Sequence, residues 1–437
     1  MFDLNDRLER RETTVSVVGL GYVGLPLTIA FSKAGFNVVG FDIDENKVKQ
    51  LNKCSDITGQ TDYHEIKNAL EKNLKITTDP KKLNTDFIII CVPTPVDNEN
   101  KPDLKPIESS ASIVGKNMKR GSIIILESTV YPGTTEEVMK PIIEKESGFR
   151  CGTDFSLAHS PERINPGDKE HKLENIVKVV GGYDEETTKI VSKLYENIIK
   201  AGTHKVNNIK TAEAVKIVEN VQRMVNISLI NELAIIFEKM GIDTKEVINA
   251  AKTKWNFIPF YPNAGVGGHC ISVDPYYLIH KSMKYGYNPK IISSSMEINE
   301  FMSVYVTNLI INHLKEEESS NKVLILGLTY KENVPDTRNT SAIKIAKEFA
   351  KNGIKVFGYD PFLDKGTIEK MGIIPVSSLG DERNIDCFLF LVAHDELKKM
   401  TAEDFKKMSS QNSLVFDIKH VLNKERVESL GMKYRSL

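Results

Sequence analysis

The stretch 13-TTVSVVGLGYVGLPLTIAFSKAGFNVVGFDID-44 decides the fold. A β-branched run ends in a glycine turn, and an amphipathic segment then leads to a second apolar run. This order predicts strand, turn, helix and strand, the building unit of a doubly wound α/β domain. The turn runs from Gly19 to Gly24 as GLGYVG, and Asp42 ends the second apolar run. Together these features predict a dinucleotide-binding site.

The glycines of this turn have separate expected roles. Gly19 permits the tight turn, Gly21 lets a pyrophosphate approach the backbone, and Gly24 allows close helix packing. Asp42 is expected to bind the ribose hydroxyls and to repel a 2'-phosphate, which predicts NAD rather than NADP. A tight turn without a ligand is the alternative. The other predicted cofactor-binding residues are Tyr22 and Val23 in the turn, Pro93 and Thr94 in the Pro-Thr-Pro segment of TDFIIICVPTPVD, and Thr129.

A weaker copy of the same pattern lies near the C-terminus. Residues 321–361, NKVLILGLTYKENVPDTRNTSAIKIAKEFAKNGIKVFGYDP, again predict strand, loop, helix and strand, and IDCFLFLVAHD matches the earlier TDFIIICVPTP. We therefore expect two doubly wound, Rossmann-like α/β domains. The second loop lacks a second glycine after Gly327 and contains Lys331 and Arg338. Such cations suit a nucleotide diphosphate, although solvated loop charges are the alternative.

One long helix is expected between the two α/β domains. Residues 208–241 combine strong helix formers with apolar residues at three- and four-residue spacing and end in Gly241. The apolar residues cover more than one face, which predicts burial against both domains or against a second subunit. The polar run KEEESSNK, 315–322, is typical of a linker. We expect an NAD-binding domain over 1–208, a central helical domain over 209–314 and a nucleotide-binding domain over 315–437.

Composition excludes several classes of protein. The 437 residues include 58 basic and 59 acidic side chains, so no strong field favours nucleic acid. The five cysteines are scattered, which predicts neither a disulfide framework nor a metal site. The N-terminal residues are charged and the apolar runs are short, so we expect no leader and no membrane span. A cytoplasmic protein fits best.

The segment AGVGGHCISVDPYY, 264–277, places Cys270 behind three glycines. In a dehydrogenase, a thiolate can add to an aldehyde as a thiohemiacetal, a second hydride can leave, and the thioester can be hydrolysed to an acid. Gly267 and Gly268, with Gly265, would let backbone N–H groups and substrate approach the sulfur. A small buried hydrophobe near a turn is the alternative.

Two further segments offer groups for this chemistry. Lys216 and Asn220 share one face of the predicted long helix and could stabilise an oxyanion, unless they belong to an exposed face. In LAHSPERINPGDKEH, Glu162 and Arg163 lie between two prolines. A carboxylate there could act as a base on hydrolytic water, and an ordinary loop ion pair is equally compatible.

Seven segments together resemble the UDP-glucose/UDP-mannose dehydrogenase family over nearly the whole chain. They are VVGLGYVGLPL, CVPTP, ESTVYPGTT, SPERINPGD, AEAVKIVEN, GVGGHCISVDPYYL and GLTYKENVPDTRNT. The resemblance implies an N-terminal NAD domain, a central helical dimerisation domain, a C-terminal UDP-binding domain and a homodimer. It implies that Cys270 is the nucleophile, that Lys216 and Asn220 steady the oxyanion, and that Asp274 and Thr129 order a catalytic water. Glu162 then serves thioester hydrolysis and Lys331 contacts UDP. The expected substrate-binding residues are Glu162, Arg163, Lys216, Asn220, Gly267, Gly268, Lys331 and Arg338.

One motif departs from the UDP-glucose pattern. Members that oxidise UDP-glucose typically have SPEFLREG, whereas Ser160–Gly167 here is SPERINPG, with Pro166 in place of the second glutamate. The version with Arg163 is similar to the N-acetylhexosamine branch, and within it to the UDP-N-acetylglucosamine 6-dehydrogenases. UDP-N-acetylmannosamine is the alternative substrate. A catalytically silent sugar-nucleotide-binding protein and a one-step alcohol dehydrogenase are competing hypotheses.

Overall fold

A computed structural model describes residues 2–437 except 57–58, 60, 98, 165–170 and 318. The chain forms two compact units. The first contains Met1–Glu219 and Tyr276–Tyr287, and the second contains Asn220–Pro275 and Asn288–Leu437. Two of the three divisions fall inside helices, α8 (Ile209–Met240) and α10 (Asp274–Lys284), and the third falls between α10 and α11 (Lys290–Glu316). Asn165, Pro166 and Gly167, on which the sugar prediction draws, lie outside the described residues.

The first unit is built on an eight-stranded sheet with the order β3-β2-β1-β4-β5-β6-β7-β8. All neighbouring strands are parallel except β6 and β7. The strands are β1 (Thr14–Val18), β2 (Asn37–Phe41), β3 (Leu74–Thr77), β4 (Phe87–Ile90), β5 (Ile123–Leu126), β6 (Ser156–His159), β7 (Lys178–Gly182) and β8 (Thr203–Lys205). The order β3-β2-β1-β4-β5-β6 is that of a dinucleotide-binding fold.

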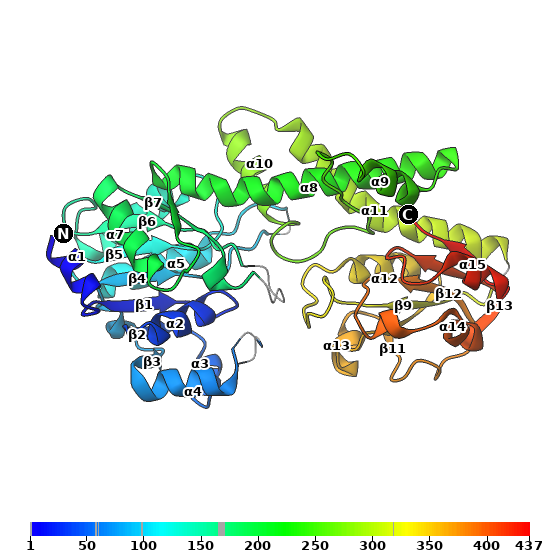
Figure 1. Ribbon diagram of the computed structural model, residues 1–437, viewed down its shortest axis with the longest axis horizontal. Coiled ribbons are helices and arrows are strands. Elements are labelled where there is room, and N and C mark those ends of the chain that lie inside the picture. Colours follow the sequence, from blue (N-terminus) through cyan, green and yellow to red (C-terminus); the bar gives the residue numbers. More distant parts are fainter. Residues whose placement is uncertain (1, 57–58, 60, 98, 165–170, 318) are drawn as a thin grey trace. The chain divides into compact units, whose positions relative to one another are not determined.

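Both faces of this sheet are covered, which explains why its strands are continuous apolar runs. Alternate side chains enter different cores: Ile89 packs with one helix layer and Ile88 with the other. The helices and short turns of the first unit, several of which Figure 1 labels around the sheet, are α1 (Phe2–Glu9), α2 (Gly24–Lys33), α3 (Glu45–Leu51), α4 (Tyr63–Lys72), α5 (Lys105–Asn117), α6 (Lys140–Ser147), α7 (Glu185–Glu196), η1 (Pro80–Leu83), η2 (Thr135–Met139) and η3 (Leu173–Asn175).

The second unit contains a six-stranded parallel sheet with the order β11-β10-β9-β12-β13-β14. Its elements are β9 (Lys322–Leu326), β10 (Lys355–Tyr359), β11 (Ile374–Pro375), β12 (Ile385–Phe390), β13 (Ser409–Asp417), β14 (Lys433–Arg435), α9 (Thr244–Ala251), α11 (Lys290–Glu316), α12 (Ser341–Lys351), α13 (Lys365–Lys370), η4 (Leu397–Lys399), α14 (Ala402–Met408) and α15 (Lys424–Ser429). The strand order repeats that of the first six strands of the first unit. The predicted pair of doubly wound domains is therefore confirmed.

The long helix predicted over 208–241 is also confirmed. Helix α8 has 32 residues and ends before Gly241, whose φ of 71° is left-handed backbone that glycine adopts without strain. The linker predicted over 315–322 is shorter in the structure, because α11 continues to Glu316 and β9 begins at Lys322. Among the described residues, no helix is both long enough and apolar enough to cross a membrane.

Candidate active site

The glycine turn after β1 lies where the strand order reverses, between β1 and β4, which is the ligand crevice of open α/β sheets. Gly19 has φ 92°, and a Cβ there would lie 2.7 Å from the carbonyl oxygen of Cys91. A Cβ on Gly24 would lie 1.9 Å from the carbonyl oxygen of Gly19, so helix and turn pack too closely for any side chain. Around Gly21 there is nothing within 4 Å of an added Cβ. This open approach to the backbone fits a pyrophosphate, so the residues present fit NAD.

Asp42 follows β2 and its carboxylate is already oriented. Its Oδ2 accepts hydrogen bonds from the backbone N–H of Leu20 at 2.9 Å and from Nζ of Lys47 at 2.8 Å. The residue is 5 % exposed, so the carboxylate is held at the edge of the crevice. Sequence reasoning missed Lys47, which lies five positions after Asp42 and brings a cation beside the acid. That cation reduces the repulsion that Asp42 alone would exert on a 2'-phosphate.

The loops after β4 and β5 are joined beside the crevice. The Ser128 hydroxyl donates to the Val92 carbonyl at 2.7 Å, which brings the turn with Pro93 and Thr94 against the loop that carries Thr129. Thr94 and Thr129 are half-buried, and Pro93 is exposed. Tyr22 and Val23, in the turn after β1, are also half-buried.

Helix α10 is fastened to the same region of the first unit. The Tyr277 hydroxyl donates to the Pro95 carbonyl at 3.1 Å, and Lys281 donates to Glu137 at 2.5 Å. The C-terminal part of α10 is therefore anchored on the turn that edges the cofactor crevice.

Glu162 follows β6 and is 9 % exposed. Its Oε1 accepts from the backbone N–H groups of Arg163 and Ile164, at 2.6 and 2.5 Å. The Arg163 guanidinium donates to the Val177 carbonyl at 2.8 Å and pairs with Glu219 on α8 at 2.7 Å. The ion pair of Arg163 is thus with a residue of the long helix, and it joins the Glu162 loop to that helix.

Glu213 is a fully buried carboxylate on α8 that sequence reasoning missed. It accepts hydrogen bonds from the backbone N–H of Gly133 and from both the N–H and the hydroxyl of Thr135. Burial raises the pKa of Glu213 to about 7. The contact fixes the start of α8 on the segment that follows Thr129, and Lys216, half-buried, lies one turn further along the helix.

In the second unit, three predicted catalytic residues come together. The Asn220 side-chain amide donates to Oδ2 of Asp274 at 2.5 Å, and the two residues are 5 % and 3 % exposed. Cys270 is half-buried, and its carbonyl accepts the backbone N–H of Asp274 at 2.8 Å. Cys270 therefore lies one helical turn before Asp274, at the entrance to α10.

The glycines before Cys270 pack against the loop that follows β9. A Cβ on Gly267 would lie 2.7 Å from the Asn339 carbonyl oxygen, and one on Gly268, with φ 84°, would lie 2.9 Å from the Tyr330 ring. The Gly268 N–H donates to the Arg338 carbonyl at 3.1 Å, and the Asn339 amide donates to the Gly268 carbonyl at 2.9 Å. These glycines thus serve close packing between two loops, a role that the sequence reasoning did not include.

The same loop carries the predicted UDP-binding cations. Arg338 is exposed and contacts Asp336, with Nε 3.0 Å from each carboxylate oxygen, and Lys331 is half-buried. Asp360 ends the second strand of this domain as Asp42 does in the first, and its Oδ2 accepts from the Leu328 N–H at 2.6 Å. His394 lies 2.9 Å from the same oxygen. This acid therefore holds the loop in place.

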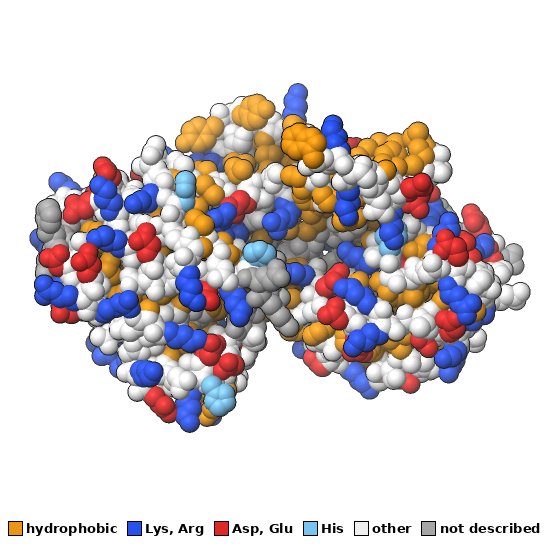
Figure 2. All heavy atoms as spheres, in the orientation of Figure 1, with side chains coloured by type: hydrophobic (Ala, Val, Ile, Leu, Met, Phe, Trp, Pro, Cys, Tyr) orange, Lys and Arg blue, Asp and Glu red, His pale blue; other side chains and the backbone are white. Residues whose placement is uncertain are grey.

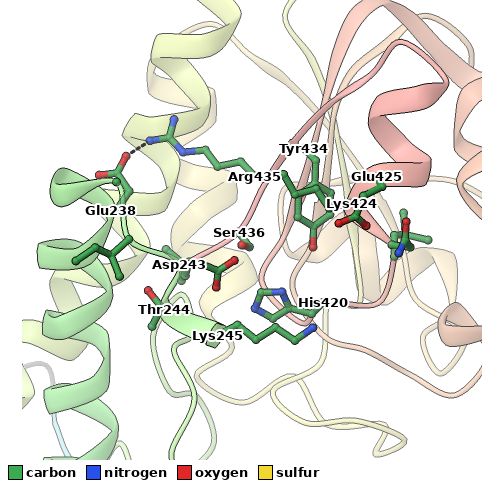
Figure 3. A pocket seen from close by; sticks show the side chains of 15 residues that line it. Glu238, Asp243, Thr244, Lys245, His420, Lys424, Glu425, Tyr434, Arg435 and Ser436 are labelled. Carbon is green, nitrogen blue, oxygen red and sulfur yellow. Dashed lines mark hydrogen bonds and ion pairs between the residues drawn. The ribbon is translucent and has the colours of Figure 1, made fainter. Parts of the chain in front are cut away.

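A pocket lies elsewhere in the second unit. It has a volume of about 480 Å³ between the end of α8 and the C-terminal strand region, and Figure 3 shows its charged walls, including the Glu238–Arg435 ion pair. None of its lining residues is a predicted site residue. The candidate site thus consists of two sets of residues, with Asn220, Cys270 and Asp274 in one unit and the cofactor turn, Thr129, Glu162 and Lys216 in the other.

Sequence patterns of a known family match all three parts of the chain. The NAD-binding domain of the UDP-glucose/GDP-mannose dehydrogenase family matches residues 13–199, its central domain 210–301 and its UDP-binding domain 324–424. The chain belongs to this family. It is an NAD-dependent nucleotide-sugar dehydrogenase with a UDP-binding domain, and the second sugar nucleotide in the family's name is GDP-mannose rather than UDP-mannose.

Individual relatives match along nearly the whole chain. A UDP-N-acetyl-D-glucosamine 6-dehydrogenase of Pseudomonas aeruginosa is 45 % identical over 421 residues, 95 % of this chain and 99 % of that protein. One of Salmonella typhi is 43 % identical over 420 residues, 95 % and 98 % of the two chains. The solved structure of a UDP-D-ManNAc dehydrogenase from Pyrococcus horikoshii has a TM-score of 0.88 at 32 % identity and covers 97 % of this chain and 98 % of its own.

Proposed function

We propose that this dehydrogenase oxidises C6 of UDP-N-acetylglucosamine to the uronic acid, with two NAD+ and one water consumed for each sugar. The observation that carries the choice of sugar is the 45 % identity to a UDP-N-acetyl-D-glucosamine 6-dehydrogenase, against 36 % to a UDP-N-acetyl-D-mannosamine dehydrogenase of Methanocaldococcus jannaschii. Arg163 in the SPER motif supports an N-acetylated sugar in the same direction. UDP-N-acetylmannosamine is the second candidate.

The reaction has balanced steps in which Cys270 is the covalent group. NAD+, when held at the turn from Gly19 to Gly24, would supply the hydride acceptor for both oxidations at C6. After the first, the alcohol has lost one proton and become an aldehyde, and the Cys270 thiolate adds to its carbonyl carbon to form a thiohemiacetal. Loss of the second hydride and of the hydroxyl proton gives a thioester. Water then breaks the C–S bond, which releases the carboxylate and returns the thiol.

The chemistry of the predicted catalytic residues fits these steps. An amide carries two hydrogens, so the contact with Asp274 engages one Asn220 N–H and the second can donate to an oxyanion, together with the Lys216 ammonium one turn away on α8. Asp274 and Thr129 order a water molecule, and Glu162 accepts a proton from the water that hydrolyses the thioester. Lys331 and Arg338 bind the UDP moiety, while Gly267 and Gly268 keep the nucleophile loop close to that binding loop.

We also infer a homodimer and a three-domain organisation of 1–208, 209–314 and 315–437. Figure 2 shows hydrophobic side chains gathered over the region of α8 and α9. Trp255 is 92 % exposed, and other exposed apolar residues of the second unit lie on the same group of helices and their connections: Leu229, Ile236, Met240, Ile242, Ile258, Ile291 and Phe301. Large apolar side chains in such numbers favour a covered interface. None of the five cysteines, all of which lie within the described residues, forms a disulfide, which supports a reducing cytoplasm.

Light scattering tests the dimer. The wild type should have twice the mass of the 49.1 kDa chain, and Trp255→Gln combined with Phe301→Gln should shift it toward the single-chain mass. A wild type that is monomeric at micromolar concentration would contradict the inference.

A substrate panel tests the function. The purified enzyme should be assayed for NADH release with UDP-glucose and with the gluco, galacto and manno N-acetylhexosamines, and the acid product should be identified by mass. The highest kcat/KM is expected for UDP-N-acetylglucosamine. A preference for UDP-N-acetylmannosamine would make that compound the substrate in place of UDP-N-acetylglucosamine. A preference for UDP-glucose would contradict the assignment of an N-acetylated sugar.

A further inference from the structure

A lysine is completely enclosed at the start of β7. Lys178 is 3 % exposed, and its Nζ lies 2.8 Å from Oε2 of Glu127 and 3.4 Å from Oε2 of Glu162. A buried ammonium is costly unless its charge is paired, so two carboxylates at these distances stabilise it strongly. Of these three residues, the reaction as described uses only Glu162.

Sheet topology brings the three charges together. Strands β5 and β6 are parallel, so Glu127 and Glu162 follow them at the same edge of the sheet. Strand β7 is antiparallel to β6, with His159 opposite Gly181, so its first residue returns to that edge beside the loop that carries Glu162. The reversal of β7 is therefore what places Lys178 next to the carboxylate.

Contacts of Tyr195 with Glu127 and with Lys178 hold the lysine side chain in place. The Tyr195 hydroxyl on α7 donates to Oε1 of Glu127, and the Lys178 Nζ lies 5.1 Å from the centroid of the Tyr195 ring. Glu127 is 0 % exposed. Burial, reinforced by the nearby charge of Glu162 and opposed by Lys178, raises the pKa of Glu127 to about 7.

The remaining titratable neighbours are neutral at physiological pH. Burial and then the charge of Lys178 lower the pKa of His159 to about 3, so the imidazole carries no charge. Desolvation and then the Glu127 carboxylate raise the pKa of the Cys91 thiol, which stays protonated. The charged groups near Glu162 are therefore Lys178, Glu127 in its ionised form, and the Arg163 guanidinium, which is paired with Glu219.

Glu162 is constrained at both oxygens. Its Oε1 accepts from two consecutive backbone N–H groups, at residues 163 and 164, and its Oε2 faces Lys178. Donors at one oxygen and a cation at the other favour the ionised carboxylate and fix its orientation. A base on hydrolytic water has to be ionised to accept a proton.

We propose that Lys178, held in place by Glu127 and Tyr195, is a positioning residue that keeps Glu162 ionised and oriented for hydrolysis of the thioester. The inference rests on the proposed function, because it gives Glu162 the role of the hydrolytic base. With a pKa of about 7, Glu127 is protonated over the acid limb of the hydrolysis rate, so it does not compete there with Glu162 for the Lys178 ammonium. Removal of the Lys178 charge should consequently shift the acid limb, whereas replacement of the Glu127 carboxyl alone should not.

Two variants test this difference. Glu127→Gln keeps Lys178 and places a neutral amide at position 127, whereas Lys178→Met/Glu127→Gln also removes the cation and leaves no buried unpaired carboxylate at position 127 that would prevent folding. The rate of thioester hydrolysis is measured against pH, from NADH release after the first turnover and from the mass of the covalent intermediate on Cys270. The acid limb, the fall of this rate toward low pH, should keep its wild-type position in the first variant and move up by about one pH unit in the second.

The double variant should also accumulate the covalent intermediate after a burst of NADH. Lys189→Met, which removes an exposed lysine of α7 paired with Glu185, is the control and should match the wild type. A merely structural role would lower burst and steady rates together and leave the acid limb unmoved, and that result would overturn the proposal.

A measurement without turnover separates this proposal from the proposed function. In protein labelled with carbon-13 at the glutamate carboxyls, the Glu162 signal is assigned from its loss in Glu162→Gln. It should titrate at higher pH in Lys178→Met/Glu127→Gln than in Glu127→Gln. Identical titrations would overturn the role of Lys178. A wild type that forms no covalent intermediate with any UDP-N-acetylhexosamine would instead overturn the proposed function.

Discussion

Asn220 donates a hydrogen bond to the Asp274 carboxylate at 2.5 Å, and both side chains are almost fully buried. One residue lies on the long helix α8 and the other is the first residue of α10, which follows the Cys270 turn. A charge-assisted bond in a buried position is strong and directional. It therefore ties an amide proposed to steady an oxyanion to the segment that presents the nucleophile.

This bond predicts strong coupling between the two residues. Asp274→Ala and Asn220→Ala should each lower kcat by about 10² to 10³-fold, because each removes or misaligns an oxyanion donor. The double variant should be little worse than either single one, since the two side chains act as a unit. The steady-state kcat is measured for the wild type, the two single variants and the double variant. Losses in kcat that multiply in the double variant would contradict the coupling.

Cofactor choice should depend on the Asp42–Lys47 pair. The wild type should prefer NAD over NADP in kcat/KM, because the Asp42 carboxylate occupies the place near the ribose hydroxyls. Asp42→Ala should reduce the preference by about tenfold, since Lys47 can then attract a 2'-phosphate. Asp42→Ala/Lys47→Met should have a lower kcat/KM with NADP than Asp42→Ala, because it lacks the cation that attracts the 2'-phosphate.

Lys49→Met is the matched control for Lys47, because Lys49 is an exposed lysine of the same helix, paired with Glu45. It should leave the ratio of the two cofactors unchanged. Comparable wild-type efficiency with NAD and NADP would contradict the role of Asp42.

The packing of the nucleophile loop predicts a large effect at Gly268. Gly268→Ala and Gly286→Ala both place a side chain on left-handed backbone, with φ 84° and 77°. That strain costs about 1–2 kcal/mol at either position. Only at Gly268 does the new Cβ also meet a ring, that of Tyr330, so this variant should lose more stability and at least about tenfold in kcat. Urea unfolding and steady-state kinetics provide the comparison, and equal effects would contradict the packing account.

The buried carboxylate of Glu213 predicts a pH dependence of stability. Its folded pKa of about 7 lies above the ordinary 4.5, so the folded state holds the proton more tightly. The stabilisation is complete below pH 4.5 and is lost as pH rises through about 7. The difference corresponds to about 3 kcal/mol.

Glu213→Gln should therefore be close to the wild type in free energy of unfolding at pH 5 and should gain on it by up to about 3 kcal/mol at pH 8. Glu71→Gln, at an exposed carboxylate paired with Lys67, should show no such gain. A difference between Glu213→Gln and wild type that stays constant with pH would rule out the titration of Glu213.

Local patterns were sufficient to predict the architecture. The turn from Gly19 to Gly24, the acid at Asp42 and the long α8 depend on residues close together in sequence, and their chemistry is specific. No local sequence pattern identified Lys178, Glu127 or Glu213. Lys178 and Glu127 are 51 residues apart, and Glu213 is 78 residues from Thr135, so these contacts exist only after the sheet order has formed.

The glycines before Cys270 also show what a local sequence pattern can predict and what it cannot. Their sequence predicts a backbone that other groups approach closely, and the structure confirms a close approach. It comes from Tyr330 and Asn339, more than sixty positions later in the chain, and no pattern near Cys270 identifies those residues.

The central claim is a four-electron oxidation through Cys270, and the ratio of NADH formed to UDP-N-acetylglucosamine consumed tests it most directly. The ratio should be two, with the uronic acid as the product and no aldehyde released. Cys270→Ala should bind both ligands and yield no acid. A ratio of one with free aldehyde, or full four-electron turnover by Cys270→Ala, would contradict the account.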